Sequence, residues 1–276
     1  MAEILNIRTP EDLGGDVLVH QPLDGGVLRL VLNNPPANTL SEAMLSALQT
    51  ALDKAQEDAS VRVIILAANG HLFCAGHDLK ELTPHREDED RGRAYFKALM
   101  DRCSAVMQSI VNHPKPVIAE VNGLATAAGC QLVASADLAI ASEDATFCTP
   151  GVHIGLFCST PMVALSRNVL RKHAMEMLLT GEAITPSHAR EIGLINRVVP
   201  VDYLEKITLQ YARNIAKKSS FTLKVGKQAF YQQADMNLAD AYAHTAQVMT
   251  ENMLARDAEE GIGAFLEDRT PEWQDE

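Results

Sequence analysis

Two segments rich in small residues, each between a predicted strand and a predicted helix, are the clearest candidates for chemistry. The first is Phe73-Cys74-Ala75-Gly76-His77-Asp78-Leu79, and the second runs from Gly123 to Gln131. Small residues let another group approach the backbone closely, and amides at the start of a helix have no intrahelical acceptor. Two such amides directed at one point form an oxyanion hole, which stabilises negative charge developing on a carbonyl oxygen. The same composition also suits simple close packing, so the structural alternative stays open.

Motifs that would indicate other common chemistries are absent from the sequence. It contains no Gly-x-Gly-x-x-Gly or Walker loop for nucleotide phosphates, no Gly-x-Ser-x-Gly elbow for a serine nucleophile and no His-Glu-x-x-His pair for zinc. The nine histidines are not spaced as metal ligands. We therefore expect no metal and no permanently bound cofactor.

The composition is that of an ordinary globular protein with an acidic surface. The 276 residues are 47% hydrophobic and 22% charged, with a formal net charge of −12. Such a charge repels phosphate backbones and anionic lipids unless a local basic patch compensates. The basic clusters around Arg167, Arg171 and Lys217 are small and scattered. We therefore expect neither nucleic acid nor membrane as a partner.

Cysteine usage and the apolar segments bear on the cellular compartment. The five cysteines include no Cys-x-x-Cys pair, which fits a reduced cytosolic protein better than a disulfide framework or a zinc site. The first twenty residues, which include Glu3, Glu11 and Asp12, lack the basic start and apolar run of an export signal. The most apolar long stretch, residues 121–141, is interrupted by polar side chains. These features predict a cytoplasmic protein without a membrane span.

Strands and helices are predicted to alternate in the first 200 residues. Ser41 is a good N-cap for a helix that ends near Ala59. Residues 69–82 are expected to form a loop, and the charged run 85–93 a solvated segment. The other expected elements are strands at 17–20, 27–32, 63–67, 117–121 and 138–141, and helices at 94–110 and 126–135. This alternation predicts an α/β fold with right-handed crossovers.

Helical spacing dominates the rest of the chain, apart from a strand expected at 194–199. Thr185 is a suitable N-cap for one of these helices. The expected helices are 174–179, 186–192, 203–216, 221–231, 238–254 and 258–266. We therefore place a boundary near Pro200, with a mixed core over residues 1–200 and a helical region over 201–276.

Four segments resemble the enoyl-CoA hydratase/isomerase (crotonase) superfamily. They are Phe73–Asp78, Val117–Ala119, Asn122–Gly129 and Phe147–Gly155. The resemblance extends over nearly the whole chain. It implies a crotonase-like (ClpP/crotonase) spiral of strand-strand-helix repeats, followed by a C-terminal helical region that forms homotrimers, often paired into hexamers as dimers of trimers.

The same resemblance implies a site for a coenzyme A thioester, as substrate or ligand. The backbone N–H groups of His77 and Ala128 would form the oxyanion hole for the thioester carbonyl. The loop that holds the adenine would be formed by Ala75, Gly76, Asp78 and Leu79. Phe265 and Arg269, supplied by a neighbouring subunit, would grip the coenzyme.

The sequence departs from the family pattern at the two glutamates that hydratases use to activate water and deliver a proton. Gln131 stands at the first position and Gly151 at the second. Neither residue can exchange a proton near neutral pH, although Gln131 can still hydrogen-bond a water. Ordinary hydration by two carboxylates is therefore not expected.

Three nearby residues are candidates for a replacement role. His153 is a competent base near pH 7, and Cys158 and Ser159 fall near the expected acyl end. The structural alternatives are that His153 is simply hydrogen-bonded in its loop and that Cys158 packs as a small buried group. Asp78 and Asp137 are expected to cap loop and helix ends rather than act as acids.

Two functions follow as competing hypotheses. One is lyase or proton-transfer chemistry at the α and β carbons of an acyl-CoA. The other is non-catalytic binding, in which the protein is an acyl-CoA sensor or buffer that keeps the oxyanion hole without the bases. RNA binding, known in one family branch, is disfavoured by the net charge of −12.

Overall fold

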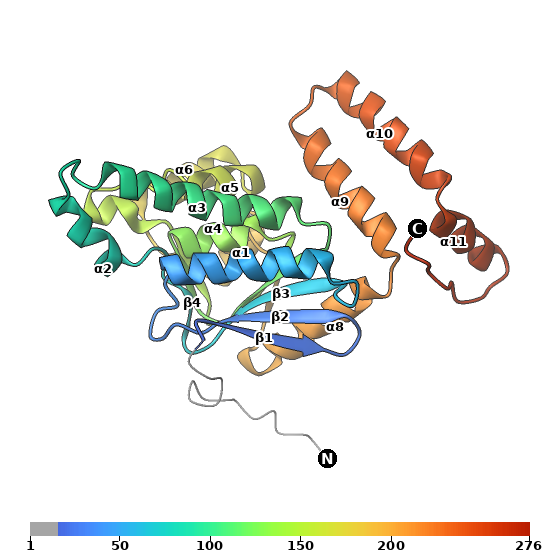
Figure 1. Ribbon diagram of the computed structural model, residues 1–276, viewed down its shortest axis with the longest axis horizontal. Coiled ribbons are helices and arrows are strands. Elements are labelled where there is room, and N and C mark those ends of the chain that lie inside the picture. The colour runs from blue at the N-terminus through green and yellow to red at the C-terminus, as the bar shows by residue number, and fades with distance from the viewer. Residues whose placement is uncertain (1–15) are drawn as a thin grey trace, which may run out of the picture.

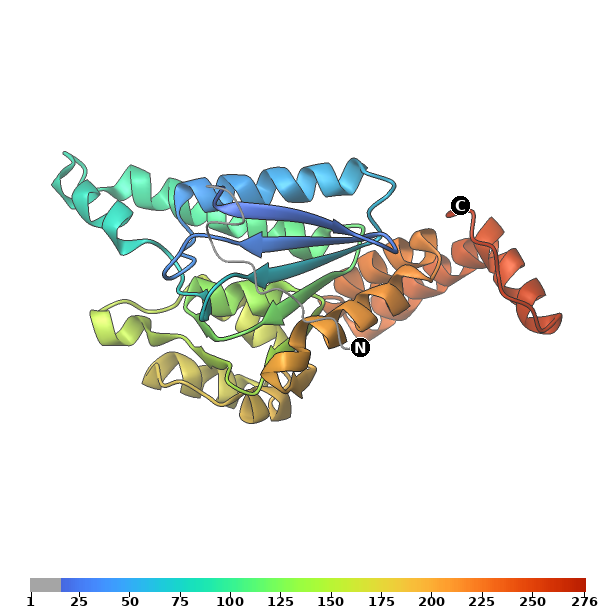
Figure 2. The same ribbon diagram turned by 90° about the horizontal axis from the view of Figure 1, so that it is seen from below.

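The computed structural model describes residues 16–276 of the chain (Figure 1). The prediction that an export signal is absent rested partly on residues outside this range, namely Glu3, Glu11 and Asp12. Two sheets and a set of surrounding helices form one body. A C-terminal group of helices projects away from it, as Figures 1 and 2 both show.

The larger sheet has six strands in the order β1-β2-β3-β5-β7-β9. The pair β1 and β2 is antiparallel, and every later neighbour is parallel. The strands are β1 (Leu18–Leu23), β2 (Val27–Leu32), β3 (Val63–Ala68), β5 (Val117–Val121), β7 (Leu138–Ser142) and β9 (Arg197–Val199). The expected strands are thus confirmed, with β9 shorter than predicted.

A smaller parallel sheet has the order β4-β6-β8. Its strands are β4 (Leu72–Cys74), β6 (Leu124–Thr126) and β8 (Thr146–Cys148). Each follows one strand of the larger sheet along the chain, so the order strand, strand, helix recurs as the predicted spiral. The prediction of a plain loop over 69–82 was wrong, because it contains β4 and α2 (Leu79–Leu82). Elements of three or four residues are too short to show a hydrophobic period.

Helices cover both faces of the larger sheet. Helix α1 (Glu42–Glu57) begins at Ser41, whose side chain accepts a hydrogen bond from the Met44 amide at 3.1 Å, as predicted. Alternate residues of β3 face different cores: Ile64 and Leu66 join the core under α1, whereas Val63 and Ile65 join the core under α8 (Leu204–Ala216). Strands buried on both faces explain the nearly continuous apolar runs in the sequence.

Most of the remaining helices match the predicted spacing, but the helix at Pro161–Asn168 was not predicted. Thr185 caps α7 as expected, accepting from the His188 amide at 3.2 Å. Helix α4 begins at Ala128 rather than at the predicted residue 126, because Leu124–Thr126 form β6. The helices are α3 (Arg93–Asn112), α4 (Ala128–Ser135), α5 (Pro161–Asn168), α6 (Arg171–Thr180) and α7 (Pro186–Glu191). Short 3-10 helices are η2 (Thr83–Glu87), η3 (Pro150–Ile154) and η4 (Val201–Tyr203).

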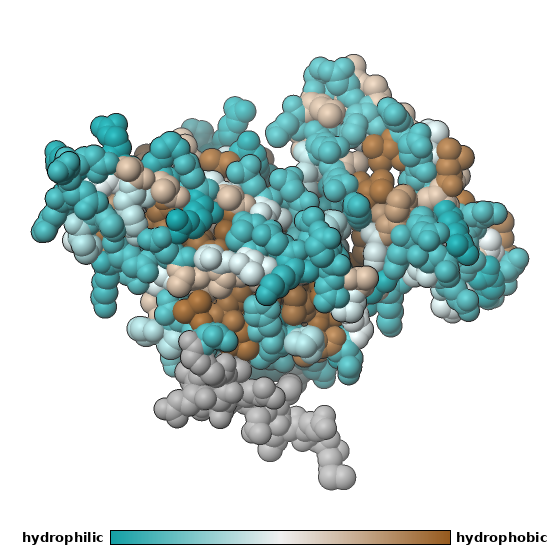
Figure 3. All heavy atoms as spheres, in the orientation of Figure 1, coloured by the Kyte–Doolittle hydropathy of each residue, from teal (hydrophilic) through white to brown (hydrophobic). Residues whose placement is uncertain are grey.

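The C-terminal arm consists of α9 (Ser220–Ala234), α10 (Leu238–Met253) and α11 (Arg256–Leu266). Lys227 on α9 holds the arm to the body: its ammonium donates to Asp137 at 2.7 Å and to the Ile110 carbonyl at 3.0 Å. The Tyr231 hydroxyl donates to the same carboxylate at 2.9 Å. Helix α10 has no buried residue, and apolar side chains gather between the arm helices (Figure 3). Within the described residues, no helix is both long and apolar enough to cross a bilayer.

Candidate active site

The two segments rich in small residues meet where β4 and β6 end. Gly76 has φ +85°, a left-handed conformation that favours glycine. A Cβ atom on Gly76 would lie 3.1 Å from the Ala127 Cβ and 3.2 Å from the Ala128 nitrogen. The loop after β4 therefore lies directly against the start of α4, which brings His77 beside Ala128 in space.

Gly129 makes the tighter of the two contacts. A Cβ atom there would lie 2.1 Å from the carbonyl oxygen of Cys74 and 2.8 Å from its carbonyl carbon, which a side chain cannot tolerate without backbone movement. Glycine at this position thus allows the first turn of α4 to pack against the end of β4. The sequence composition indicated close approach, and the structure shows between which atoms it occurs.

The amides of His77 and Ala128 are unpaired, since neither donates a hydrogen bond within residues 16–276. Ala128 is the first residue of α4, so its N–H has no intrahelical acceptor and adds to the positive end of the helix dipole. Ala127, just before it, has φ +51°, which is unusual for a residue with a side chain. Such strained residues are concentrated at functional sites.

Residues just before α1, which the sequence analysis did not identify, form hydrogen bonds that position the loop carrying His77. The Leu40 amide donates to the Gly76 carbonyl at 2.8 Å, and Leu40 forms a parallel bridge with His77. Asn38 is buried and its side-chain amide donates to the carbonyls of Asn69 and Leu72, both at 2.8 Å. These supporting roles of Asn38 and Leu40 are visible only in the tertiary contacts. The preceding Asn-Asn-Pro-Pro sequence at residues 33–36 indicates only that a strand ends there.

The His77 side chain is half-buried, and neither ring nitrogen makes a hydrogen bond within the described part of the chain. Burial lowers the pKa of this imidazole, which the nearby Leu40 backbone partly opposes. The ring is therefore neutral near pH 7. The predicted role of His77 in the oxyanion hole uses its main-chain N–H rather than this ring.

The predicted adenine loop, Ala75–Leu79, borders a surface cavity. Asp78 caps α2 by accepting from the Lys80 amide at 2.9 Å, as expected for a capping residue. Leu79 is exposed, and together with Lys80 and Thr83 it lines a cavity of about 590 Å³. Contact of Ala75, Gly76, Asp78 and Leu79 with a coenzyme stays a prediction.

At the expected acyl end, Gln131 lies on α4 one turn after Ala128. Its side chain is buried, and its carbonyl oxygen has no hydrogen-bond partner among residues 16–276. A buried, unsatisfied amide oxygen is suited to accept a hydrogen bond from a ligand or a water. It cannot take up a proton as a glutamate would.

Gly151 is buried in η3, and the chain folds back over it. A Cβ atom at this position would lie 3.0 Å from the Leu156 carbonyl oxygen and 3.1 Å from the Cys158 sulfur. The Cys158 thiol thus occupies the space where a longer side chain at 151 would begin. Burial raises the pKa of Cys158 and Cys148, and also that of Cys130, so these thiols stay protonated and are not nucleophiles near pH 7.

His153 and Ser159 are both exposed. The Nε2 atom of His153 lies 2.9 Å from the Thr180 carbonyl oxygen, at the end of α6. This contact favours the tautomer with a proton on Nε2 and leaves Nδ1 as the possible base. The Ser159 hydroxyl donates to the Phe157 carbonyl at 3.3 Å. A catalytic role for either residue stays a prediction.

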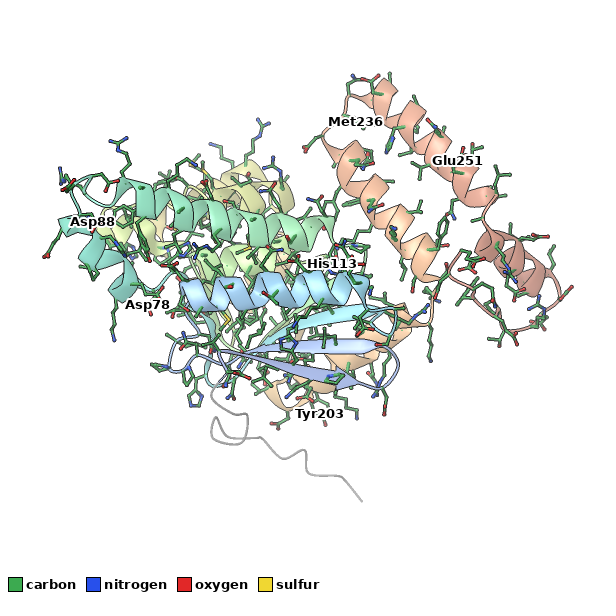
Figure 4. All side chains as sticks on the ribbon, viewed as in Figure 1. Asp78, Asp88, His113, Tyr203, Met236 and Glu251 are labelled. Carbon is green, nitrogen blue, oxygen red and sulfur yellow. The ribbon has the colours of Figure 1, made fainter. Side chains whose placement is uncertain are left out.

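Phe265 and Arg269 belong to the arm or directly follow it. Phe265 is 84% exposed, and Arg269 binds Glu260 at 2.6 and 2.9 Å and Glu267 at 2.7 Å. Figure 4 labels Asp78 at one end of the body and Met236 and Glu251 on the arm beyond the other end. Phe265 and Arg269, at the end of the arm, therefore do not reach the His77 site of their own chain. A role for them at that site requires a second subunit.

Comparison with known proteins gives consistent matches over nearly the whole chain. A family model described as Enoyl-CoA hydratase/isomerase matches residues 23–276. Human enoyl-CoA hydratase domain-containing protein 3, mitochondrial, is 50% identical over 252 residues, which are 91% of this chain and 82% of that protein.

Solved structures agree with the sequence matches. The crystal structure of human enoyl Coenzyme A hydratase domain-containing protein 3 has a TM-score of 0.88 at 50% identity, covering 93% of this chain and 100% of that one. An enoyl-CoA hydratase from Mycobacterium smegmatis has a TM-score of 0.88 at 48% identity, covering 93% and 98%. These matches confirm the predicted crotonase-like fold. Over most of the chain, the similarity is to enoyl-CoA hydratase domain-containing protein 3 in both sequence and structure.

Proposed function

The chain belongs to the enoyl-CoA hydratase/isomerase family, and from this premise we propose that it binds an acyl-CoA thioester through the amides of His77 and Ala128. The proposal is supported by the close approach of Gly76 to the Ala128 nitrogen and by the unpaired amides of His77 and Ala128 in the described residues. Pre-positioned donors stabilise an enolate oxygen without reorganisation, and loss of one donor in comparable sites costs on the order of 10² to 10³ in rate.

The reaction class proposed is lyase or proton-transfer chemistry at the acyl α and β carbons. In hydration, a water oxygen bonds to the β carbon, the carbon–carbon double bond opens, one water proton goes to a base and a proton is delivered to the α carbon. Here Gln131 can orient the water but not deprotonate it. We assign the base to Nδ1 of His153, since Nε2 is engaged by Thr180.

A direct test incubates the protein with crotonyl-CoA and follows the loss of enoyl absorbance. Turnover that His153→Ala abolishes supports His153 as the base. Turnover that survives this change removes His153 from the mechanism while leaving the amide site in place. Ser159→Ala is a suitable control, because Ser159 is exposed and bonds only to a nearby main-chain carbonyl.

A second candidate function is non-catalytic acyl-CoA binding, as a sensor or buffer. The observation in its favour is that Gln131, Gly151 and the protonated Cys158 thiol leave no titrating group among the buried residues described at the acyl end. Tight binding of hexanoyl-CoA with no turnover of crotonyl-CoA supports this function over the first. Failure to bind any acyl-CoA contradicts both.

For the assembly we propose a homotrimer, or a hexamer made of two trimers, joined through the arm. Phe230, Leu238, Tyr242, Leu254 and Leu266 on the arm are each more than half exposed, which is unusual for large apolar side chains. Sedimentation velocity measures the mass directly, and a monomer at micromolar concentration contradicts this assembly. The cytoplasmic location stays a prediction from the sequence; the human relative is named mitochondrial.

A further inference from the structure

A groove between α7, α8 and β9 lies apart from the candidate active site, at the edge of the larger sheet. Its volume is about 560 Å³, which is within the usual range for pockets that hold small organic ligands. Its polar lining comes from Arg190 on α7, Arg197 on β9, and Gln210, Tyr211 and Asn214 on α8. Helix α8 lies on the face of this sheet opposite α1 (Figure 1).

Both arginines in the groove lack an anionic partner. Within the described part of the chain, neither guanidinium has a carboxylate oxygen within 4.0 Å, and neither makes a hydrogen bond. Two carboxylates of the neighbouring elements are engaged elsewhere: Glu191 with His188 at 3.3 Å and Glu205 with Arg29 at 3.7 Å. Two unpaired guanidinium groups in one groove of a chain with net charge −12 indicate a site for an anion.

Arg190 and Arg197 are both exposed, and Arg197 also contacts an aromatic ring of the groove. Its guanidinium carbon lies 5.1 Å from the centre of the Tyr211 ring, a cation–π contact that restrains the side chain while using none of its N–H donors. The side chains of Gln210, Tyr211 and Asn214 make no hydrogen bonds within residues 16–276. Val198 and Ile207 add an apolar wall.

We propose that this groove binds a small organic anion, in which a carboxylate or phosphate group is attached to an apolar or aromatic body. Arg190 and Arg197 bind the anionic group, since a guanidinium fork matches both carboxylate and phosphate oxygens. Tyr211, Val198 and Ile207 contact the apolar body. This site is independent of the acyl-CoA site and does not rest on the function proposed above.

Isothermal titration calorimetry of the full chain at low salt tests the proposal with three probes: phenyl phosphate, benzoate and inorganic phosphate. We expect saturable binding of phenyl phosphate or benzoate at one site per chain, and weaker binding of inorganic phosphate, which lacks the apolar body. The tighter of the first two probes identifies the anionic group. Arg190→Gln and Arg197→Gln should each weaken binding about tenfold or more.

Arg213→Gln is the matched control, because Arg213 is on the same helix and carries the same charge but does not line the groove. Arg197→Lys keeps the positive charge and loses the guanidinium fork, so it should bind with intermediate affinity. This variant also tests the proposal if Arg197→Gln does not fold. Absence of saturable binding, or an equal loss in Arg213→Gln, overturns the proposal. A smaller mass for the Arg190→Gln/Arg197→Gln double variant in sedimentation also overturns it, since a second copy of the chain would then cover the groove.

Discussion

The two ends of the candidate active site differ in how they are built. The carbonyl end, formed by Gly76, His77, Ala128 and Gly129, presents main-chain amides in a position fixed by close backbone contacts. The acyl end, formed by Gln131, Gly151, His153 and Cys158, depends on side chains, and its buried members do not titrate near pH 7.

This difference shows how a fold can keep one function and change another. Main-chain donors persist through substitution as long as the glycines that permit the approach persist. Proton transfer requires particular side chains, and a single substitution removes it. In the proposed function, binding and turnover therefore rest on different residues, and we expect that each can be altered separately.

The largest expected effect is at the carbonyl end. Gly129→Ala forces a Cβ to within 2.1 Å of the Cys74 carbonyl oxygen, so we expect the free energy of unfolding to fall by about 3 kcal/mol and acyl-CoA binding to be lost. Urea unfolding and titration with hexanoyl-CoA measure the two effects. Gly226→Ala in α9 is the control, because a Cβ there meets nothing within 4 Å and alanine favours a helix. Parent-like stability and affinity in Gly129→Ala would show that the close approach is not required.

At the acyl end, restoring the carboxylates should produce the next largest effect. Gln131→Glu with Gly151→Glu and Cys158→Ala should raise hydration of crotonyl-CoA by about 10²-fold, at the low end of general acid–base contributions. Cys158→Ala is included because its sulfur would lie 3.1 Å from the new Cβ. The control is the same triple change with glutamines at 131 and 151. No gain over that control would mean that the acyl end lacks more than its two carboxylates.

His77→Gln separates the side chain from the amide at one position. Acyl-CoA affinity should stay within about threefold of the parent, because the donor is the main-chain N–H. In the parent protein, burial lowers the folded-state pKa of His77, so the unfolded chain binds a proton more readily than the folded chain. The free energy of unfolding of the parent therefore falls as pH drops below about 6.5. The His77→Gln variant lacks this group, so its stability should be less sensitive to acid. Urea midpoints at pH 7.5 and 5.5 for both proteins measure this difference. A large loss of affinity would assign the binding to the imidazole.

The smallest expected effect concerns the thiols of the acyl end. Because burial raises the pKa of Cys148 and Cys158, alkylation of the native protein by iodoacetamide at pH 7.5 should be slow and should accelerate in urea. Mass spectrometry of the labelled peptides gives the rate at each cysteine. Rapid labelling of Cys158 in the native protein would make it a reactive thiol and reopen a nucleophilic role.

The sequence was sufficient for most of the fold because long periodic segments carry strong signals. The strand Val117–Val121 and the caps Ser41 and Thr185 were predicted where they occur. The strands β4, β6 and β8 were missed, because three residues cannot show alternation and their pairing is set by distant contacts. At the site, the family resemblance assigned the oxyanion hole to His77 and Ala128, and that role stays a prediction. Other features of the site arise from tertiary contacts that no local sequence pattern encodes. They are the strained backbone at Ala127, the hydrogen bonds from Asn38 and Leu40, and the Cys158 thiol beside Gly151.

The central claim is that two main-chain amides bind one thioester carbonyl oxygen. A crystal structure with hexanoyl-CoA, a saturated ester that cannot be hydrated, tests it most directly. We predict the carbonyl oxygen within about 2.7–3.1 Å of both the His77 and Ala128 nitrogens. A carbonyl oxygen bound by other groups, with both amides facing solvent, would contradict the claim.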